Sequence, residues 1–130
     1  MKTVHLFIKN YYINTLVGNE LELSLAEEAT ILDVIKTVDE MISRKEKSSS
    51  EPEDSLLYRL YNPVKDRFYK QVSIIAYTKP GEFLNVRDHP QSILPKGVIV
   101  HVNPEGPCIT EWEKPIDVEI FKRITRYREN

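Results

Sequence analysis

The chain has 130 residues, 41% of them hydrophobic, 29% charged and only four of them glycine, which is typical of one globular domain and excludes a disordered chain. A net charge of −2 argues against nucleic acid, and no stretch approaches the roughly 18 apolar residues that a membrane span needs. We expect a cytoplasmic protein, since the start lacks signal-peptide features and one cysteine, Cys108, cannot form an internal disulfide.

Two strands and a long connection between them are predicted at the N-terminus. Residues 3–9 and 21–25 alternate apolar and more polar side chains, which indicates strands with one face in the core. The apolar positions are Val4, Leu6 and Ile8 in the first strand and Leu21, Leu23 and Leu25 in the second. The sequence therefore predicts an N-terminal hairpin.

An amphipathic helix gives the clearest periodic signal in the chain. Its apolar residues, spaced to lie on one face, are Ile31, Val34, Ile35, Val38, Met41 and Ile42. Thr30 can cap the N-terminus, with Asp33 in the position that a capping box gives to an acidic residue. The cations of residues 44–47 suit the C-terminus, so we expect the helix to end there.

The middle of the chain begins with a polar segment. Residues 48–55 contain no apolar side chain and one proline, which predicts a flexible, solvated loop. Residues 56–61 follow as a short ordered piece, for which the pattern leaves a helical turn and a strand open.

Three further strands are predicted. Residues 71–77 are typical of a buried strand, and Pro80 and Gly81 form a turn that leads to a short strand at 82–86. Residues 98–102 are apolar on both faces apart from His101, which predicts a strand in the centre of the sheet.

The pattern changes after Pro104, so we predict one domain over residues 1–106 and a C-terminal extension over residues 107–130. The residues that share a helical stripe after Pro115 are Ile116, Ile120, Phe121, Ile124 and Tyr127. Alternation of Ile116, Val118 and Ile120 leaves a strand open, although we favour the helix.

These elements form an α+β layout, a mixed sheet packed on one main helix. Their order resembles the β-grasp (ubiquitin-like) family of MoaD and ThiS, the small subunit of molybdopterin synthase and the thiamine sulfur carrier. Residues 72–82 are similar to the family's apolar strand and turn, residues 93–100 to its Leu-x-x-Gly-Asp-x-Val segment, and residues 104–106 to its Pro-x-x-Gly-Gly tail. The resemblance covers about residues 1–106 and implies a β-grasp fold.

The tail departs from the family pattern. Sulfur carriers of this family use a terminal glycine carboxylate, which is adenylated and then converted to a thiocarboxylate. In this chain Gly106 is followed by Pro107 and residues 108–130, so its carbonyl belongs to a peptide bond. We therefore expect a non-catalytic interaction module or accessory subunit that docks on a larger enzyme or an E1-like activating enzyme through its sheet face. The alternative is a sulfur-carrier or ubiquitin-like modifier precursor that is cut after Gly106.

No catalytic residue, cofactor or metal site is predicted. The spacings of His5, His89 and His101 match no ligand pattern, and Cys108 has no adjacent base or cation. Basic residues between 122 and 128 favour a solvated helix face over a surface for an acidic partner.

Aromatic residues supply the predicted partner-docking site. Tyr11 and Tyr12, in the hairpin connection, and the lone tryptophan, Trp112, are our docking candidates, because aromatic side chains often anchor interfaces. The other aromatic residues considered, for docking or for core packing, are Tyr58, Tyr61, Phe68, Tyr69 and Tyr77.

Overall fold

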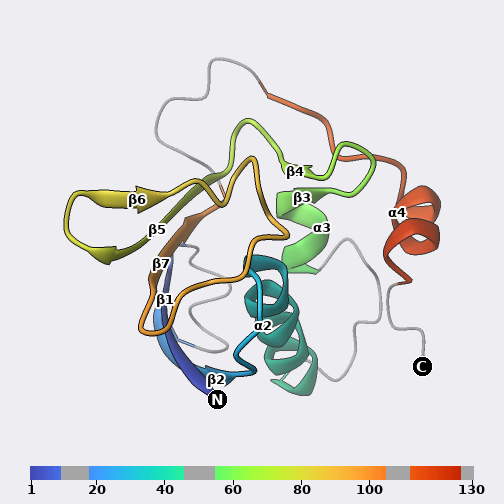
Figure 1. Ribbon diagram of the computed structural model, residues 1–130. Helices are drawn as coiled ribbons and strands as arrows, with labels where there is room; N and C mark the ends of the chain where they lie inside the picture. The colour runs from blue at the N-terminus through green and yellow to red at the C-terminus, as the bar shows by residue number, and fades with distance from the viewer. Residues whose placement is uncertain (10–17, 46–54, 105–111, 127–130) are drawn as a thin grey trace.

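The computed structural model describes residues 1–9, 18–45, 55–104 and 112–126 (Figure 1). Five strands form a mixed sheet in the order β2-β1-β7-β5-β6. Their bounds are β1 Lys2–Ile8, β2 Glu20–Leu25, β5 Ser73–Lys79, β6 Glu82–Leu84 and β7 Ile99–Asn103. β1 runs parallel to β7, and the other neighbours are antiparallel. The predicted hairpin and the predicted central strand are both confirmed.

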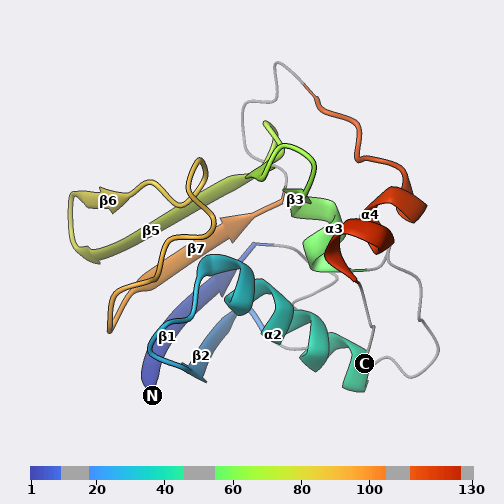
Figure 2. The same ribbon diagram turned by 45° about the vertical axis from the view of Figure 1, so that its right-hand side comes forward.

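Three helices, α2 (Ile31–Lys45), α3 (Leu56–Leu60) and α4 (Val118–Thr125), lie on one side of this sheet, as Figures 1 and 2 show. A small hairpin of β3 (Tyr61–Asn62) and β4 (Arg67–Phe68) follows α3. None of the helices in the described ranges is long and apolar enough to cross a membrane. The architecture is the predicted α+β sheet packed on one main helix.

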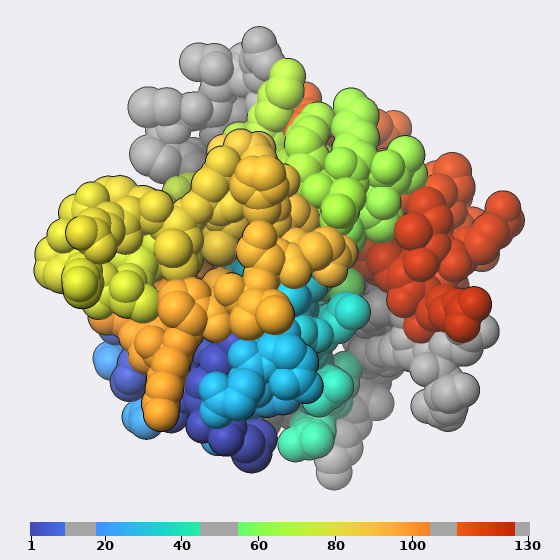
Figure 3. Space-filling model, in the orientation of Figure 1, coloured from blue at the N-terminus to red at the C-terminus, as the bar shows by residue number. Residues whose placement is uncertain are grey.

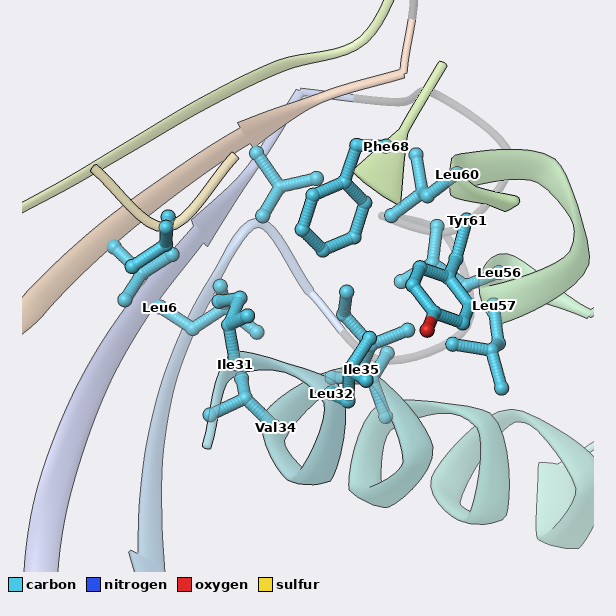
Figure 4. Close-up of a cluster of buried hydrophobic side chains, with 14 of the residues drawn as sticks. Leu6, Ile31, Leu32, Val34, Ile35, Leu56, Leu57, Leu60, Tyr61 and Phe68 are labelled. Carbon is cyan, nitrogen blue, oxygen red and sulfur yellow. The ribbon is translucent and has the colours of Figure 1, made fainter. Parts of the chain in front are cut away.

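The core lies between the sheet and α2. The predicted inward positions of β1 are buried, and so are those of α2 apart from a half-buried Met41. Thr30 caps α2 as predicted: its Oγ1 accepts from the N–H of Asp33 at 3.4 Å, and Asp33 Oδ2 accepts from the N–H of Thr30 at 2.8 Å in return. Figure 4 shows side chains from β1, α2, α3 and the β3–β4 hairpin converging there. Burial of this apolar set stabilises the fold.

The undecided segment after residue 55 is helical, and α2 determines where it begins. The Asp39 carboxylate on α2 accepts hydrogen bonds from the backbone N–H groups of Leu56 (2.6 Å) and Leu57 (3.1 Å). Ser55 Oγ donates to Asp39 at 2.9 Å and accepts from the N–H of Tyr58. Ser55 is buried as this helix cap, so any solvated loop ends at residue 54 rather than 55. Residues 48–54 lie outside the described ranges.

Two predicted segments differ in detail from the structure. β5 was predicted to be buried, but only Ala76 is fully buried within it and its other face is open. α4 begins at the cap residue Asp117 rather than at Pro115, and its buried side chain is Phe121. Ile120 and Ile124, predicted on the same stripe as Phe121, are exposed, because the helix packs on Tyr58 through Phe121.

Candidate functional site

The sheet face turned away from the three helices carries a row of aromatic rings from four strands. We call Phe7 (β1), His101 (β7), Tyr77 (β5) and Phe83 (β6) the aromatic row. Alternation along β1 places Phe7 on this face, because its neighbours Leu6 and Ile8 point into the core. Strand pairing then aligns the others, since Phe7 lies opposite His101, and Tyr77 lies opposite Phe83.

Ring contacts connect the whole row. His101 stacks on Phe7 with centroids 4.8 Å apart and planes 10° apart, and on Tyr77 at 5.8 Å and 11°. Tyr77 Oη lies 3.3 Å from His101 Nε2 and is hydrogen-bonded to it. Phe83 meets Tyr77 edge-on at 6.0 Å. Such pairs each contribute about 0.5–1.5 kcal/mol beyond area burial, so the contacts favour this arrangement of the rings.

Apolar exposure increases toward the β5–β6 side of this face. The Phe83 side chain is 66% exposed, and Ile75, which lies opposite His101, is 42% exposed. Ile99, opposite Tyr77, is half buried. In Figure 3 the β5–β6 hairpin projects from the molecule on the side opposite α4. Aromatic side chains held in this way are the usual anchors of protein–protein interfaces.

Acidic side chains flank the row on the β2 side. Glu20 lies opposite Phe7 in the β1–β2 ladder, Glu22 lies opposite His5, and both glutamates are exposed. Residues that face each other across a ladder share one face of the sheet. The face therefore has an apolar, aromatic centre and one acidic border.

This arrangement offers a surface suited to binding. Its polar groups are the Tyr77 hydroxyl and the His101 imidazole, which are hydrogen-bonded to each other, and the His101 ring stacks on both Phe7 and Tyr77. Among the described residues, no group of three His, Cys, Asp or Glu side chains is placed to hold a metal ion. The chemistry available to this face is burial of apolar area with acidic residues on one border.

The predicted site residues have different outcomes. Tyr11, Tyr12 and Gly106 lie outside the described residues, so they stay predictions. Trp112 is 57% exposed, but it begins the described part of the C-terminal segment, whose next residue contacts Arg67 and Gln71 rather than the aromatic row. The structure does not bring Trp112 into the sheet-face site.

The remaining aromatic residues divide between the core and the sheet face. Tyr61, Phe68 and Tyr69 are buried, as the core interpretation expected, and Tyr58 is half buried. Tyr77 alone of that set lies in the aromatic row. We did not single out Phe7, His101 or Phe83 as a docking site, although the strand alternation around Phe7 carried that information.

Comparison with solved structures supports the fold. The small archaeal modifier protein 1 of H. volcanii superimposes with a TM-score of 0.51 at 9% identity, covering 81% of this chain and 99% of that one. A putative molybdopterin converting factor, subunit 1, from Pyrococcus furiosus has a TM-score of 0.49 at 19% identity, with the same coverage. No protein-family model matches the chain, and no curated protein matches its sequence. The β-grasp, ubiquitin-like fold predicted from the MoaD and ThiS resemblance is confirmed.

Proposed function

We propose that this chain is a non-catalytic, cytoplasmic interaction module, the accessory subunit of a larger enzyme, and that the enzyme subunit docks on the aromatic row. The observation that carries the proposal is Phe83, a large aromatic side chain that is 66% exposed at the end of the row and meets Tyr77 edge-on. An exposed ring held by its neighbours loses little conformational freedom on binding, and therefore binds with a low entropic cost.

The apolar and acidic side chains of this face indicate the chemical character of the partner's docking surface. Its docking surface would offer an apolar pocket for Phe83 and Ile75, and basic side chains opposite Glu20 and Glu22. Because Glu20 and Glu22 lie together on the β2 side, they would fix the orientation in which the partner docks.

The test uses a partner identified by affinity purification from the native host and then purified itself. Calorimetric titration compares the wild type with Phe83→Glu, which places a charge in the apolar centre, and we expect affinity to fall at least about tenfold. Val64→Glu is the matched control, because Val64 is also an exposed apolar residue but lies in the turn of the β3–β4 hairpin. Equal affinity of Phe83→Glu and the wild type would contradict the proposal.

The second candidate function is a sulfur carrier or ubiquitin-like modifier precursor, cut after Gly106 and activated by an E1-like enzyme. The fold shared with an archaeal modifier protein favours it. Its test is intact-mass spectrometry of the protein from its native host. A chain ending at Gly106, or that chain with one oxygen replaced by sulfur, would support it, and a full-length mass in every growth condition would contradict it.

A further inference from the structure

The C-terminal segment, residues 112–126, packs against the part of the chain that contains α3 and the β3–β4 hairpin (Figure 2). We call residues 55–72 the body surface. The connection from β7, residues 105–111, lies outside the described residues, and so does the predicted boundary between residues 106 and 107. Most of the hydrogen bonds that hold this segment come from side chains of the body surface, and they differ from the strand pairing within the sheet.

Gln71 holds the main chain of the segment at one point. Its side-chain Nε2 donates to the carbonyl oxygen of Glu113 at 3.0 Å, and its Oε1 accepts from the N–H of Glu113 at 3.1 Å. A carboxamide that pairs with both backbone groups of one residue replaces the two hydrogen bonds of a strand partner. This contact recognises an extended peptide whatever its side chain.

Two tyrosines hold the main chain at a second point. Tyr58 Oη donates to the carbonyl oxygen of Ile116 at 2.8 Å, and Tyr69 Oη accepts from the N–H of Ile116 at 3.0 Å. Both backbone groups of this residue are again satisfied by side chains of the body surface. The body surface thus binds the backbone groups of two residues of the segment, three positions apart.

The Glu113 side chain adds a specific anchor. Arg67 Nη1 and Nη2 donate to its two carboxylate oxygens at 2.6 and 2.9 Å, and the N–H of Lys70 donates at 2.8 Å. These donors, Arg67 above all, lower the pKa of the Glu113 carboxyl to about 2. A carboxylate is therefore the group this position selects.

Phe121 is the second specific anchor. Its side chain is fully buried and meets Tyr58 edge-on, with centroids 5.1 Å apart. Asp117 caps α4 from within the segment, accepting from the N–H groups of Glu119 and Ile120. The helix thus brings its own N-terminal cap, although eight residues are too few to be stably helical alone.

We propose that the body surface is a peptide-binding site whose ligand is the C-terminal segment of the same chain, held as a separable ligand that stays bound after the connection at 105–111 is cut. The ligand it fits is an extended peptide with a carboxylate anchor, followed by a short helix that inserts one aromatic ring. The proposal does not depend on the sheet-face function, because the two surfaces share no residue.

The first test cuts the full-length chain. Residues 105–111 are replaced by the recognition sequence of a site-specific protease, and the cut protein is passed through a size-exclusion column at neutral pH. We expect mass spectrometry to find the body and the 112–130 fragment together in equal amounts. If the 112–130 fragment separates from the rest of the folded chain at a micromolar protein concentration, the proposal is overturned.

The second test measures specificity with synthetic peptides of residues 112–130, so that the substitutions leave the body unchanged. A fluorescent peptide should exchange into the cut protein but bind the uncut chain at least about tenfold more weakly, because the tethered segment competes at a high effective concentration. As competitors, the Glu113→Gln and Phe121→Ala peptides should each be at least about tenfold weaker than the native peptide. The Glu119→Gln peptide is the control and should compete like the native peptide. Glu119 is exposed, and among the described ion pairs its carboxylate pairs only with Lys122 of the same peptide, at 3.6 Å. Equal competition by Glu113→Gln and Glu119→Gln, or equal binding to cut and uncut protein, would overturn the proposal.

Discussion

Arg67 and Glu113, 46 residues apart in the sequence, form a two-point ion pair that ties the C-terminal segment to the β3–β4 hairpin. The pair is mostly shielded from water, and the N–H of Lys70 donates to the same carboxylate. Two parallel hydrogen bonds between charged groups fix the geometry as well as the energy. Its consequence is a dependence of stability on pH.

Acid should weaken the protein through Glu113. Its pKa is lowered from 4.5 to about 2, so the carboxylate stabilises the folded state above pH 4.5, and this contribution is lost as the pH falls toward 2. The contribution is at most about 3 kcal/mol, less after allowing for partial solvent screening. Urea unfolding of the wild type and of Glu113→Gln should differ at pH 7 and converge near pH 2. A constant difference across this range would contradict the assignment.

Loss of the Asp39 carboxylate should destabilise α3. Asp39→Ala removes the acceptor for the N–H groups of Leu56 and Leu57, which are then unpaired at a buried helix start. We expect a loss of about 1–2 kcal/mol in the free energy of unfolding, measured in urea. Glu40→Ala is the matched control, since Glu40 is the exposed neighbour on the same helix, and it should lie within about 0.5 kcal/mol of the wild type. A similar loss in both variants would argue against the cap.

The sequence predicted those parts of the fold whose signal is local. Strand alternation at Val4, Leu6 and Ile8 and helical spacing from Ile31 to Ile42 each reflect one buried face, and both appear where expected. The local pattern of residues 56–60 does not decide between helix and strand, because the helix depends on Asp39, which contacts it from 17 or more residues away.

The candidate site was less predictable for the same reason. Phe7, His101 and Phe83 come from three separate strands, so only the pairing register brings them into one row. The prediction for α4 was wrong at Ile120 and Ile124, because the contact with Tyr58, distant in sequence, selects Phe121 as the buried side chain.

Phe121 should be far more important for stability than its apolar neighbour on the same helix. Phe121→Ala leaves a cavity next to Tyr58 in the core, and we expect a loss of about 3–5 kcal/mol. Ile124→Ala removes a side chain that is half exposed, and its effect should stay within about 1 kcal/mol. Thermal and urea unfolding of the two variants check this difference. If the two losses are equal, Phe121 does not anchor the segment.

The buried ammonium group of Lys2 connects β1 to two loops, one with Glu27 and Ala29 and one with Leu94. Its position on β1 shares the core face with Val4, and its side chain is only 1% exposed. The ammonium donates to the carbonyl oxygens of Glu27, Ala29 and Leu94 at 2.7, 2.9 and 2.5 Å, so its three N–H groups are all satisfied.

Lys2→Met keeps the apolar stem but removes the ammonium from three carbonyl groups, of which only that of Ala29 also accepts from a backbone N–H, that of Leu94 at 3.0 Å, among the described contacts. We expect a loss of about 2–4 kcal/mol in the free energy of unfolding, since unpaired buried acceptors cost more than a good hydrogen bond contributes. Lys36→Met, an exposed position on α2, is the matched control and should be close to neutral. Hydrogen exchange of the β1 amides should increase in Lys2→Met and not in the control. A Lys2→Met variant as stable as the wild type would show that water replaces the ammonium at these carbonyls. The hydrogen bonds of Lys2 would then not be needed for stability.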